Sequence, residues 1–324
     1  MKVSVIMSTY KTDEQQLKQS IESILNQSFK DFEFLITIDG VCNDYLVAKK
    51  IKDKRVKIIN NNKNCGLPSA LNHMLDIAQG EYIARMDADD ISCIDRIEKQ
   101  IDFLDRHNEY DVCGTYAKII GENNFIVSNL NDYDYLKCKL LNKNVIVHPS
   151  IIIRNSFIKQ HNIRYDEKYI KSQDFELYSR IKNITKIYIY PEALLYYRRG
   201  SNKNNCIKTK WVNHEMVIQK NVNELELNNN ICEYLLYLDN YPYCAKKYSI
   251  SDCILNNNKI LTANKRKGIY NQDKLIKYLS FSLFKKKIYE KNILSLFLIK
   301  FDFFMYLINK KETIKKLSKK KYIY

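Results

Sequence analysis

Two aspartates separated by one residue, Asp87 and Asp89, are the side chains of this chain best suited to holding a divalent cation. Hard cations such as Mg²⁺ take oxygen ligands, and one or two protein carboxylates suffice when water and phosphate oxygens complete the shell. A cation held in this way can bind a diphosphate group and stabilise it as a leaving group. A solvated turn or a helix N-cap is the commoner origin of an isolated Asp-x-Asp, so the surroundings of the triplet must decide.

Strands and helices alternate around this triplet. Apolar runs predict strands over residues 3–7 and 32–38, the second buried on both sides, and further strands fit residues 55–59 and 81–86. A helix pattern follows the first strand, and Gly66-Leu67-Pro68-Ser69 begins another helix, with Gly80 as its expected glycine cap. This order predicts an α/β fold with a doubly wound, mostly parallel sheet flanked by helices. Ligands of such sheets bind beyond the carboxyl ends of the strands, where Asp39 and Asp87 fall.

The rest of the sequence is less regular. It predicts helices over residues 95–108, 133–142 and 172–181, and strands over residues 112–120, 145–153 and 187–190. From about Trp211 the pattern is mainly helical, and asparagine runs at residues 228–230 and 256–258 predict turns. We therefore place a domain boundary near residue 210.

Composition narrows the possible partners only partly. The chain has 324 residues, and its formal charge of +16 suits nucleic acid, anionic lipid or a phosphorylated substrate. Its nine cysteines are scattered and form no Cys-x-x-Cys pair, as expected of reduced cysteines in the cytosol. The first residues enter a strand pattern at once and resemble no signal peptide, so a cytoplasmic protein is expected.

Three stretches taken together resemble bacterial family 2 glycosyltransferases. They are SVIMSTY at residues 4–10, SIESILNQSF at residues 20–29 and YIARMDADD at residues 82–90. The resemblance covers roughly the first two thirds of the chain and implies an inverting enzyme with the GT-A fold. It makes residues 1–210 the catalytic domain, with a nucleotide-sugar part in about 1–120 and an acceptor part in about 121–210. Residues 211–324 are then a helical, basic C-terminal extension.

The resemblance also implies a donor site for a nucleotide-sugar. It puts the Ser8-Thr9-Tyr10 loop at the nucleoside and Asp39 on a uracil base, whose imide N–H suits a carboxylate. Asp39-Gly40 also fits a plain turn. Asp89 becomes the direct ligand of Mg²⁺ or Mn²⁺, while Asp87 serves the ribose, the metal or both.

Four further residues are implied to lie near the nucleotide. For each of them an ordinary loop, cap or surface role fits equally well. They are Asn64, Gly66, Asn72 and Arg85.

On the acceptor side, the resemblance makes Asp174 the base that removes the acceptor hydroxyl proton. An acidic residue in the first turn of a helix also needs no catalytic explanation, because the helix dipole favours it. Many relatives have an acidic residue where Gln173 stands, and Glu176 is the reserve candidate. His148 either lines the acceptor pocket or belongs to a turn that leads into a strand. In such a turn, Pro149 restricts the backbone of the residue before it. Arg199 and its neighbour either approach the diphosphate or face water.

The C-terminal segment has two interpretations. Residues 275–308 mix aromatic and aliphatic side chains with lysines, and residues 310–324 contain seven lysines and one glutamate. No apolar run reaches the roughly 18 residues of a spanning helix. The segment therefore suits either an interfacial helix on an anionic membrane surface or a helical cap with a solvated basic tail.

The function expected from all this is transfer of a sugar from a nucleotide-sugar, chiefly a UDP-sugar, to a glycan or lipid-linked acceptor. Capsule, lipopolysaccharide or other surface polysaccharide synthesis is the expected setting, in the cytoplasm or on the inner face of the membrane. A sugar nucleotidyltransferase is the alternative enzyme, but it would need a glycine-rich loop after the first strand, where Ser8-Thr9-Tyr10-Lys11 stands. A basic nucleic-acid-binding protein is the other alternative, although it leaves the acidic strand ends unexplained. We expect no nucleic-acid partner.

Overall fold

A computed structural model describes residues 1–121, 125–128, 132–199, 207–239, 244 and 247–289. Contacts divide the chain into two units. The first comprises Met1–Asn131 and Ile146–Lys210, and the second comprises Asp132–Val145 and Trp211–Tyr324.

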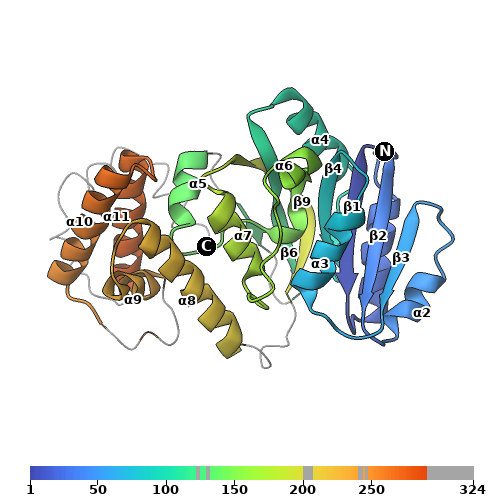
Figure 1. Cartoon of the computed structure of the whole chain (residues 1–324), viewed down its shortest axis with the longest axis horizontal. Helices are drawn as coiled ribbons and strands as arrows, with labels where there is room; N and C mark the ends of the chain where they lie inside the picture. The colour runs from blue at the N-terminus through green and yellow to red at the C-terminus, as the bar shows by residue number, and fades with distance from the viewer. Residues whose placement is uncertain (122–124, 129–131, 200–206, 240–243, 245–246, 290–324) are drawn as a thin grey trace. The chain divides into compact units, whose positions relative to one another are not determined.

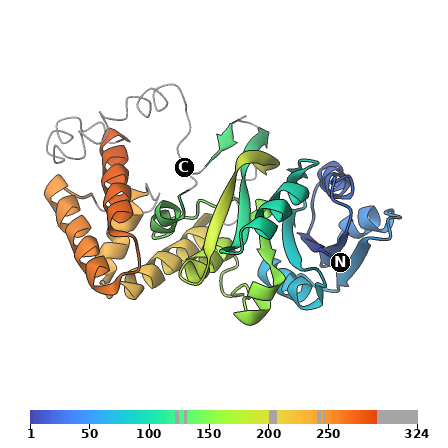
Figure 2. The same cartoon turned by 90° about the horizontal axis from the view of Figure 1, so that it is seen from above.

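The first unit is built on a nine-stranded sheet with helices on both faces (Figures 1 and 2). The strand order is β3-β2-β1-β4-β8-β6-β9-β5, and β7 pairs with β6. The strands are β1 Val3–Thr9, β2 Phe32–Asp39, β3 Val56–Asn61, β4 Tyr82–Asp87, β5 Ile91–Ser92, β6 Tyr110–Gly121, β7 Ile126–Val127, β8 Ile152–Arg154 and β9 Lys186–Arg199. Strands β1 to β4 are parallel, and the antiparallel β8 joins them to β6.

Apolar side chains on both faces of β1 explain why this strand is buried in the middle of the sheet. Val3, Val5 and Met7 belong to a core cluster that contains residues of three helices. Ile6, which alternates with them, is also buried and lies by α3 and α7. The helices of this unit are α1 Glu14–Leu25, α2 Asp44–Lys49, α3 Leu67–Ile77, α4 Arg96–Arg106, α6 Asn155–Gln160, α7 Gln173–Ile181 and the 3₁₀ turn η1 His148–Ser150.

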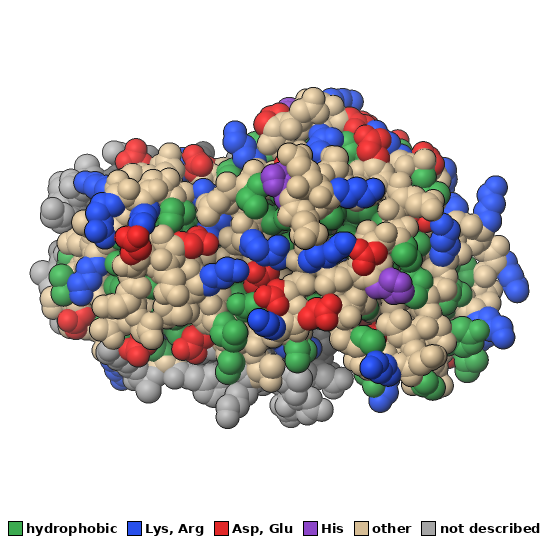
Figure 3. Space-filling view, in the orientation of Figure 1, with side chains coloured by type: hydrophobic (Ala, Val, Ile, Leu, Met, Phe, Trp, Pro, Cys, Tyr) green, Lys and Arg blue, Asp and Glu red, His purple; other side chains and the backbone are tan. Residues whose placement is uncertain are grey.

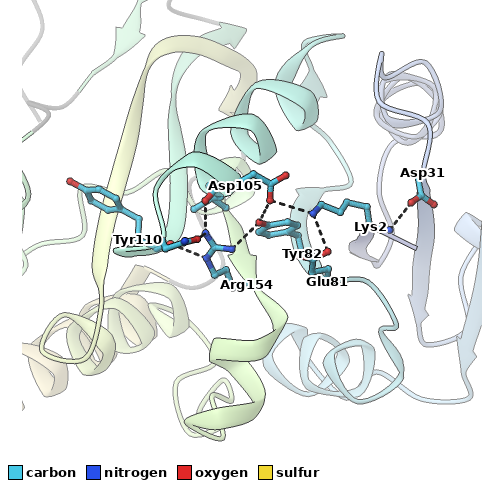
Figure 4. Close-up of polar contacts among 9 residues, drawn as sticks. Lys2, Asp31, Glu81, Tyr82, Asp105, Tyr110 and Arg154 are labelled. Atoms are coloured by element: carbon cyan, nitrogen blue, oxygen red, sulfur yellow. Dashed lines mark hydrogen bonds and ion pairs between the residues drawn. The ribbon is translucent and has the colours of Figure 1, made fainter.

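The register of the sheet brings the carboxyl ends of its central strands together. Ser8 of β1 lies beside Asp87 of β4, and Asp39 of β2 lies beside Asn61 of β3. The amino ends of β1 and β4 lie at the opposite edge. There Lys2 contacts Glu81 at 3.0 Å and Asp105 at 3.3 Å, and Tyr82 donates to Asp105 at 2.5 Å (Figure 4).

Two local predictions in this unit are wrong. The strand expected over residues 145–153 is reduced to β8 and preceded by η1, because Pro149 cannot donate a backbone bond and Ser150 Oγ instead bonds to Val147 O at 2.7 Å. Gly80 is not a helix cap, since α3 ends at Ile77 with Ala78 as its cap. Gly80 is needed for close packing, because a Cβ there would lie 2.3 Å from the backbone nitrogen of Ser4.

The described part of the second unit is helical. Its helices are α5 Tyr133–Lys139, α8 Ile207–Glu224, which begins in the first unit, α9 Asn229–Leu238, α10 Ile250–Lys267 and α11 Gln272–Tyr289. The turn expected at residues 256–258 is wrong, because these residues lie inside α10. Asn256 is buried, and Asn257 accepts a hydrogen bond from Tyr234 at 2.7 Å, so tertiary contacts override the asparagine preference for turns.

Residues Asp132–Val145 group with these helices rather than with the predicted acceptor part. Asp132 pairs with Lys274 of α11 at 2.5 Å, and the amide of Asn221 in α8 donates to Leu140 O at 2.9 Å. No helix among the described residues is long and apolar enough to cross a bilayer. The predicted basic tail lies outside the described residues, as does most of residues 275–308.

Candidate functional site

A cleft of about 1280 Å³ lies at the carboxyl ends of β1, β2 and β4. It brings together most of the residues predicted to bind donor, metal or acceptor. These are Ser8, Tyr10, Asp39, Asn64, Gly66, Asp87, Asp89, Gln173 and Arg199. Thr9, Asn72, Arg85, His148 and Asp174 are not among its lining residues.

The acidic loop, residues 87–92, begins at the last residue of β4 and concentrates negative charge at this cleft. The Asp87 carboxylate accepts a hydrogen bond from Arg85, whose own side chain is buried. Burial, followed by the charge of Asp87, raises the pKa of Asp89. Asp90 is fully buried, and burial and its two acidic neighbours raise its pKa well above the ordinary value. The two guanidinium groups of Arg85 and Arg198 therefore face three clustered carboxyl groups, and a bound cation would offset the remaining negative charge.

Arg198, at the end of β9, lines the cleft and bonds to the acidic loop. Its backbone N–H donates to Asp90 Oδ1 at 2.7 Å, and its Nε donates to the carbonyl of Asp89 at 2.8 Å. Arg199 also lines the cleft and lies over the Phe125 ring at 5.4 Å. Arg198 thus places a positive charge beside the acidic loop, where an anionic ligand would meet it.

Asp39 anchors the loop that forms one wall of the cleft. Its Oδ1 accepts from the side chain of Asn61 at 3.1 Å and from the Cys65 N–H at 2.9 Å. Its Oδ2 accepts from the Gly66 N–H at 2.9 Å, and Gly66 adopts a φ of 87°. Asp39 therefore holds Asn64 and Gly66 at the cleft. A contact of its carboxylate with uracil stays a prediction.

The loop after β1 is fixed from inside the protein. Ser8 and Tyr10 reach the cleft, whereas the buried Thr9 hydroxyl bonds to Asp44 and, at 2.8 Å, to Thr12. Asp44 also accepts from the Thr12 N–H at 3.1 Å. Asp44 lies outside every quoted motif, and only the fold brings it beside Thr9.

The two candidate bases, Asp174 and Glu176, both lie in the first turn of α7 but have different surroundings. Gln173 lines the cleft, and Asp174 follows it with Oδ1 accepting from the Phe175 N–H at 2.8 Å. Glu176 is buried and makes a two-pronged ion pair with Arg180, at 3.1 and 2.9 Å. This pairing makes Glu176 a poor proton acceptor and leaves Asp174 as the better candidate.

His148, which is buried, and Asn72, which is half-buried, both bond to Tyr165 instead of lining the cleft. His148 bonds through Nδ1 to the Tyr178 hydroxyl at 2.8 Å and through Nε2 to the Tyr165 hydroxyl at 3.2 Å. Burial, followed by the charge of Arg85, holds the pKa of His148 well below its ordinary value of 6.5. Asn72 donates to the carbonyl of Tyr165 at 2.9 Å and accepts from its N–H at 2.8 Å. The geometry thus gives His148 and Asn72 supporting contacts rather than positions on the cleft surface.

Residues 4–185 match the model of glycosyl transferase family 2. The chain belongs to this family. The predicted resemblance is confirmed. The family match favours a glycosyltransferase over a nucleotidyltransferase or a nucleic-acid-binding protein.

Relatives support this family assignment, and a solved structure supports the fold. An uncharacterized glycosyltransferase of Methanocaldococcus jannaschii is 36% identical over 217 residues, which are 64% of this chain and 74% of the relative. The O-antigen biosynthesis glycosyltransferase WbnJ of Escherichia coli is 35% identical over 190 residues, 56% of this chain and 72% of the relative. S. aureus TarS 1-349, solved in complex with UDP-GlcNAc, has a TM-score of 0.59 and 15% identity, covering 87% of this chain and 84% of that one. The match to the longer TarS chain covers 53% of its length. The predicted GT-A fold is confirmed.

Proposed function

We propose that this family 2 glycosyltransferase transfers a sugar from a UDP-sugar to a glycan or lipid-linked saccharide, with inversion, during surface polysaccharide synthesis. The acidic loop beside the cleft is the observation that carries the proposal. The O-antigen role of WbnJ and the UDP-GlcNAc bound to TarS support the acceptor class and the donor class, respectively.

The proposed cofactor is Mg²⁺ or Mn²⁺, with Asp89 as the direct ligand. Among the described residues, no group of three or more His, Cys, Asp or Glu side chains is arranged to hold a metal ion. The carboxylates of Asp89 and Asp87 nevertheless fit a cation that takes its other ligands from water and diphosphate oxygens. When bound, such a cation would supply positive charge to the diphosphate.

The proposed base is Asp174. As it accepts the proton of the acceptor hydroxyl, the acceptor oxygen bonds to the anomeric carbon. The bond from that carbon to the diphosphate oxygen breaks on the opposite face, and its electron pair leaves with UDP. Arg198 lies where it can offset the charge that develops on the leaving group.

The experiment that tests this proposal is a screen of UDP-sugars for slow donor hydrolysis, with and without Mn²⁺. At least one donor should be hydrolysed faster with Mn²⁺, and Asp89→Asn should lower that rate by about 100-fold or more. Asp95→Asn is the control, because Asp95 is outside the cleft and pairs with Lys99 at 2.8 Å. Full metal-dependent activity in Asp89→Asn would refute the assignment of the acidic loop.

We further propose that the protein works at the inner face of the cytoplasmic membrane. The lysines of residues 310–324 support this location, because an anionic leaflet attracts a basic segment.

A further inference from the structure

Helix α1 carries three polar side chains along one line, Ser20, Ser23 and, just past the helix end, Gln27. Ser20 and Gln27 are fully buried. Buried polar groups require hydrogen-bond partners. The partners of these three side chains therefore show which part of the protein they stabilise. The three residues belong to the motif SIESILNQSF, which the donor and acceptor sites leave unexplained.

The partners lie at both ends of the acidic loop. Ser20 Oγ donates to the carbonyl of Asp87 at 2.7 Å. Ser23 Oγ accepts from the Ser92 N–H at 3.0 Å. Side chains of one helix therefore hold the loop from its first residue to Ser92.

Gln27 adds hydrogen bonds to the residues just after the loop and to the first turn of α4. Its Nε2 donates to the carbonyl of Cys93 at 2.7 Å, and its Oε1 accepts from the Ile97 N–H at 3.1 Å, in the first turn of α4. The buried Arg96 adds a bond from its Nε to Ser92 Oγ at 2.7 Å. The downstream end of the loop is thus held by several bonds at once.

The three polar residues are also linked to one another. Ser23 Oγ donates to the carbonyl of Ser20 at 2.7 Å, and Gln27 Nε2 donates to the carbonyl of Ser23 at 3.0 Å. A shift of one of them would therefore disturb the others.

We propose that Ser20, Ser23 and Gln27 are positioning residues that fix the backbone of residues 87–93 and thereby the separation of the Asp87 and Asp89 carboxylates. The inference that this affects donor binding rests on the proposed function. An error of about 1 Å in the placement of reacting groups can cost about 100-fold in rate, so such a hold has a measurable effect.

The apolar anchor of α1 is separate from this polar line. Leu17, Ile21 and Ile24 pack into the core cluster of the sheet. Removing the Ser20 hydroxyl leaves these contacts in place, so the effect on donor binding should exceed the effect on folding.

Hydrogen exchange tests the hold itself, independently of any activity. Ser23→Ala removes the acceptor of the Ser92 N–H and should speed exchange of that amide by about tenfold or more. Ser28→Ala is the matched control, because the exposed Ser28 hydroxyl bonds to Glu98 at 2.6 Å and not to the acidic loop. Equal exchange of residues 87–93 in the two variants would overturn the inference.

Calorimetry with UDP and Mn²⁺ tests the consequence. Ser20→Ala should weaken binding by about 5- to 30-fold relative to Ser28→Ala, with a small drop in its unfolding midpoint because the carbonyl of Asp87 loses this donor. A lower midpoint with unchanged UDP affinity would mean that Ser20 serves only helix packing, and would overturn its positioning role. If the unsubstituted protein does not bind UDP with Mn²⁺, the proposed function fails, and the exchange experiment still decides whether α1 holds the loop.

Discussion

Asp174 and Glu176 are two residues apart in α7, yet their carboxylates have different surroundings. Arg180 neutralises the buried Glu176, whereas Asp174 follows the cleft residue Gln173. We predict that Asp174→Asn lowers sugar transfer by about 10²- to 10⁴-fold while UDP binding with Mn²⁺ is unchanged, because only proton removal is lost. Transfer assays and calorimetry on the same preparation check this.

Glu176→Gln provides the comparison for that prediction. It leaves Arg180 without its ionic partner and should lower the free energy of unfolding, with turnover per folded molecule largely retained. A loss of turnover in Glu176→Gln with full activity in Asp174→Asn would reverse the assignment.

The buried His148 predicts a pH dependence of stability. Its pKa lies well below 6.5 in the folded protein, so below about pH 6.5 the unfolded chain binds a proton that the folded protein does not. The stability due to neutral His148 is present above that pH and is lost as the pH falls toward the folded pKa. Thermal unfolding between pH 7 and pH 5 should show a smaller decline for His148→Gln than for the unsubstituted protein. Parallel declines would contradict this prediction.

The residue types at the strand ends could be predicted from the sequence, and their partners could not. Asp39 and Asp87 follow buried strands, and strand ends meet at one edge of a parallel sheet. The contacts of Asn72 with Tyr165 and of Arg198 with Asp90 join residues 93 and 108 positions apart. Only the folded chain brings such pairs together, so a short motif does not indicate them.

At the scale of elements, strands β1 to β4 were all predicted from the sequence, β1 and β2 from their apolar runs. The prediction for Gly80 failed because a contact between residues far apart in the sequence decides its role. The helix pattern before β4 suggested a glycine cap, whereas Gly80 instead lies against β1, with its N–H donating to Ser4 Oγ at 2.8 Å.

This packing predicts that Gly80→Ala is severely destabilising. The new methyl group would meet backbone atoms of Val3 and Ser4 at 2.6 and 2.3 Å, which a flexible side chain cannot relieve. We expect a loss of at least about 3 kcal/mol in the free energy of unfolding, measured with denaturant. Gly268→Ala is the control, because its methyl group would meet nothing within 4 Å, and the cost of its left-handed backbone conformation is about 1 to 2 kcal/mol. Equal losses in the two variants would show that the close approach at Gly80 is not limiting.

At the scale of the whole molecule, the distribution of charged side chains differs between the face shown in Figure 3 and the C-terminal residues 310–324. Acidic side chains are interspersed among Lys and Arg on the face shown in Figure 3. Residues 310–324, in contrast, contain seven lysines against one glutamate. This segment is therefore a candidate for attraction to an anionic surface.

Deleting residues 310–324 should abolish co-sedimentation with vesicles that contain anionic lipid. Each lysine near such a surface contributes about 1 kcal/mol, and salt weakens the attraction. UDP binding with Mn²⁺ should be unchanged, since the cleft belongs to the first unit. Undiminished sedimentation of the truncated protein would assign membrane binding to another segment.

The grouping of Asp132–Val145 with the C-terminal helices limits how this protein can be recombined with its relatives. The chain leaves the first unit after Asn131, returns at Ile146 and leaves again after Lys210. A chimera joined once near residue 210 would pair α5 of one parent with α11 of the other, and contacts such as that of Asp132 with Lys274 would have to match by chance. Exchange of the helical part as a module therefore requires two grafts made together, and natural variation in α5 should follow variation in α11.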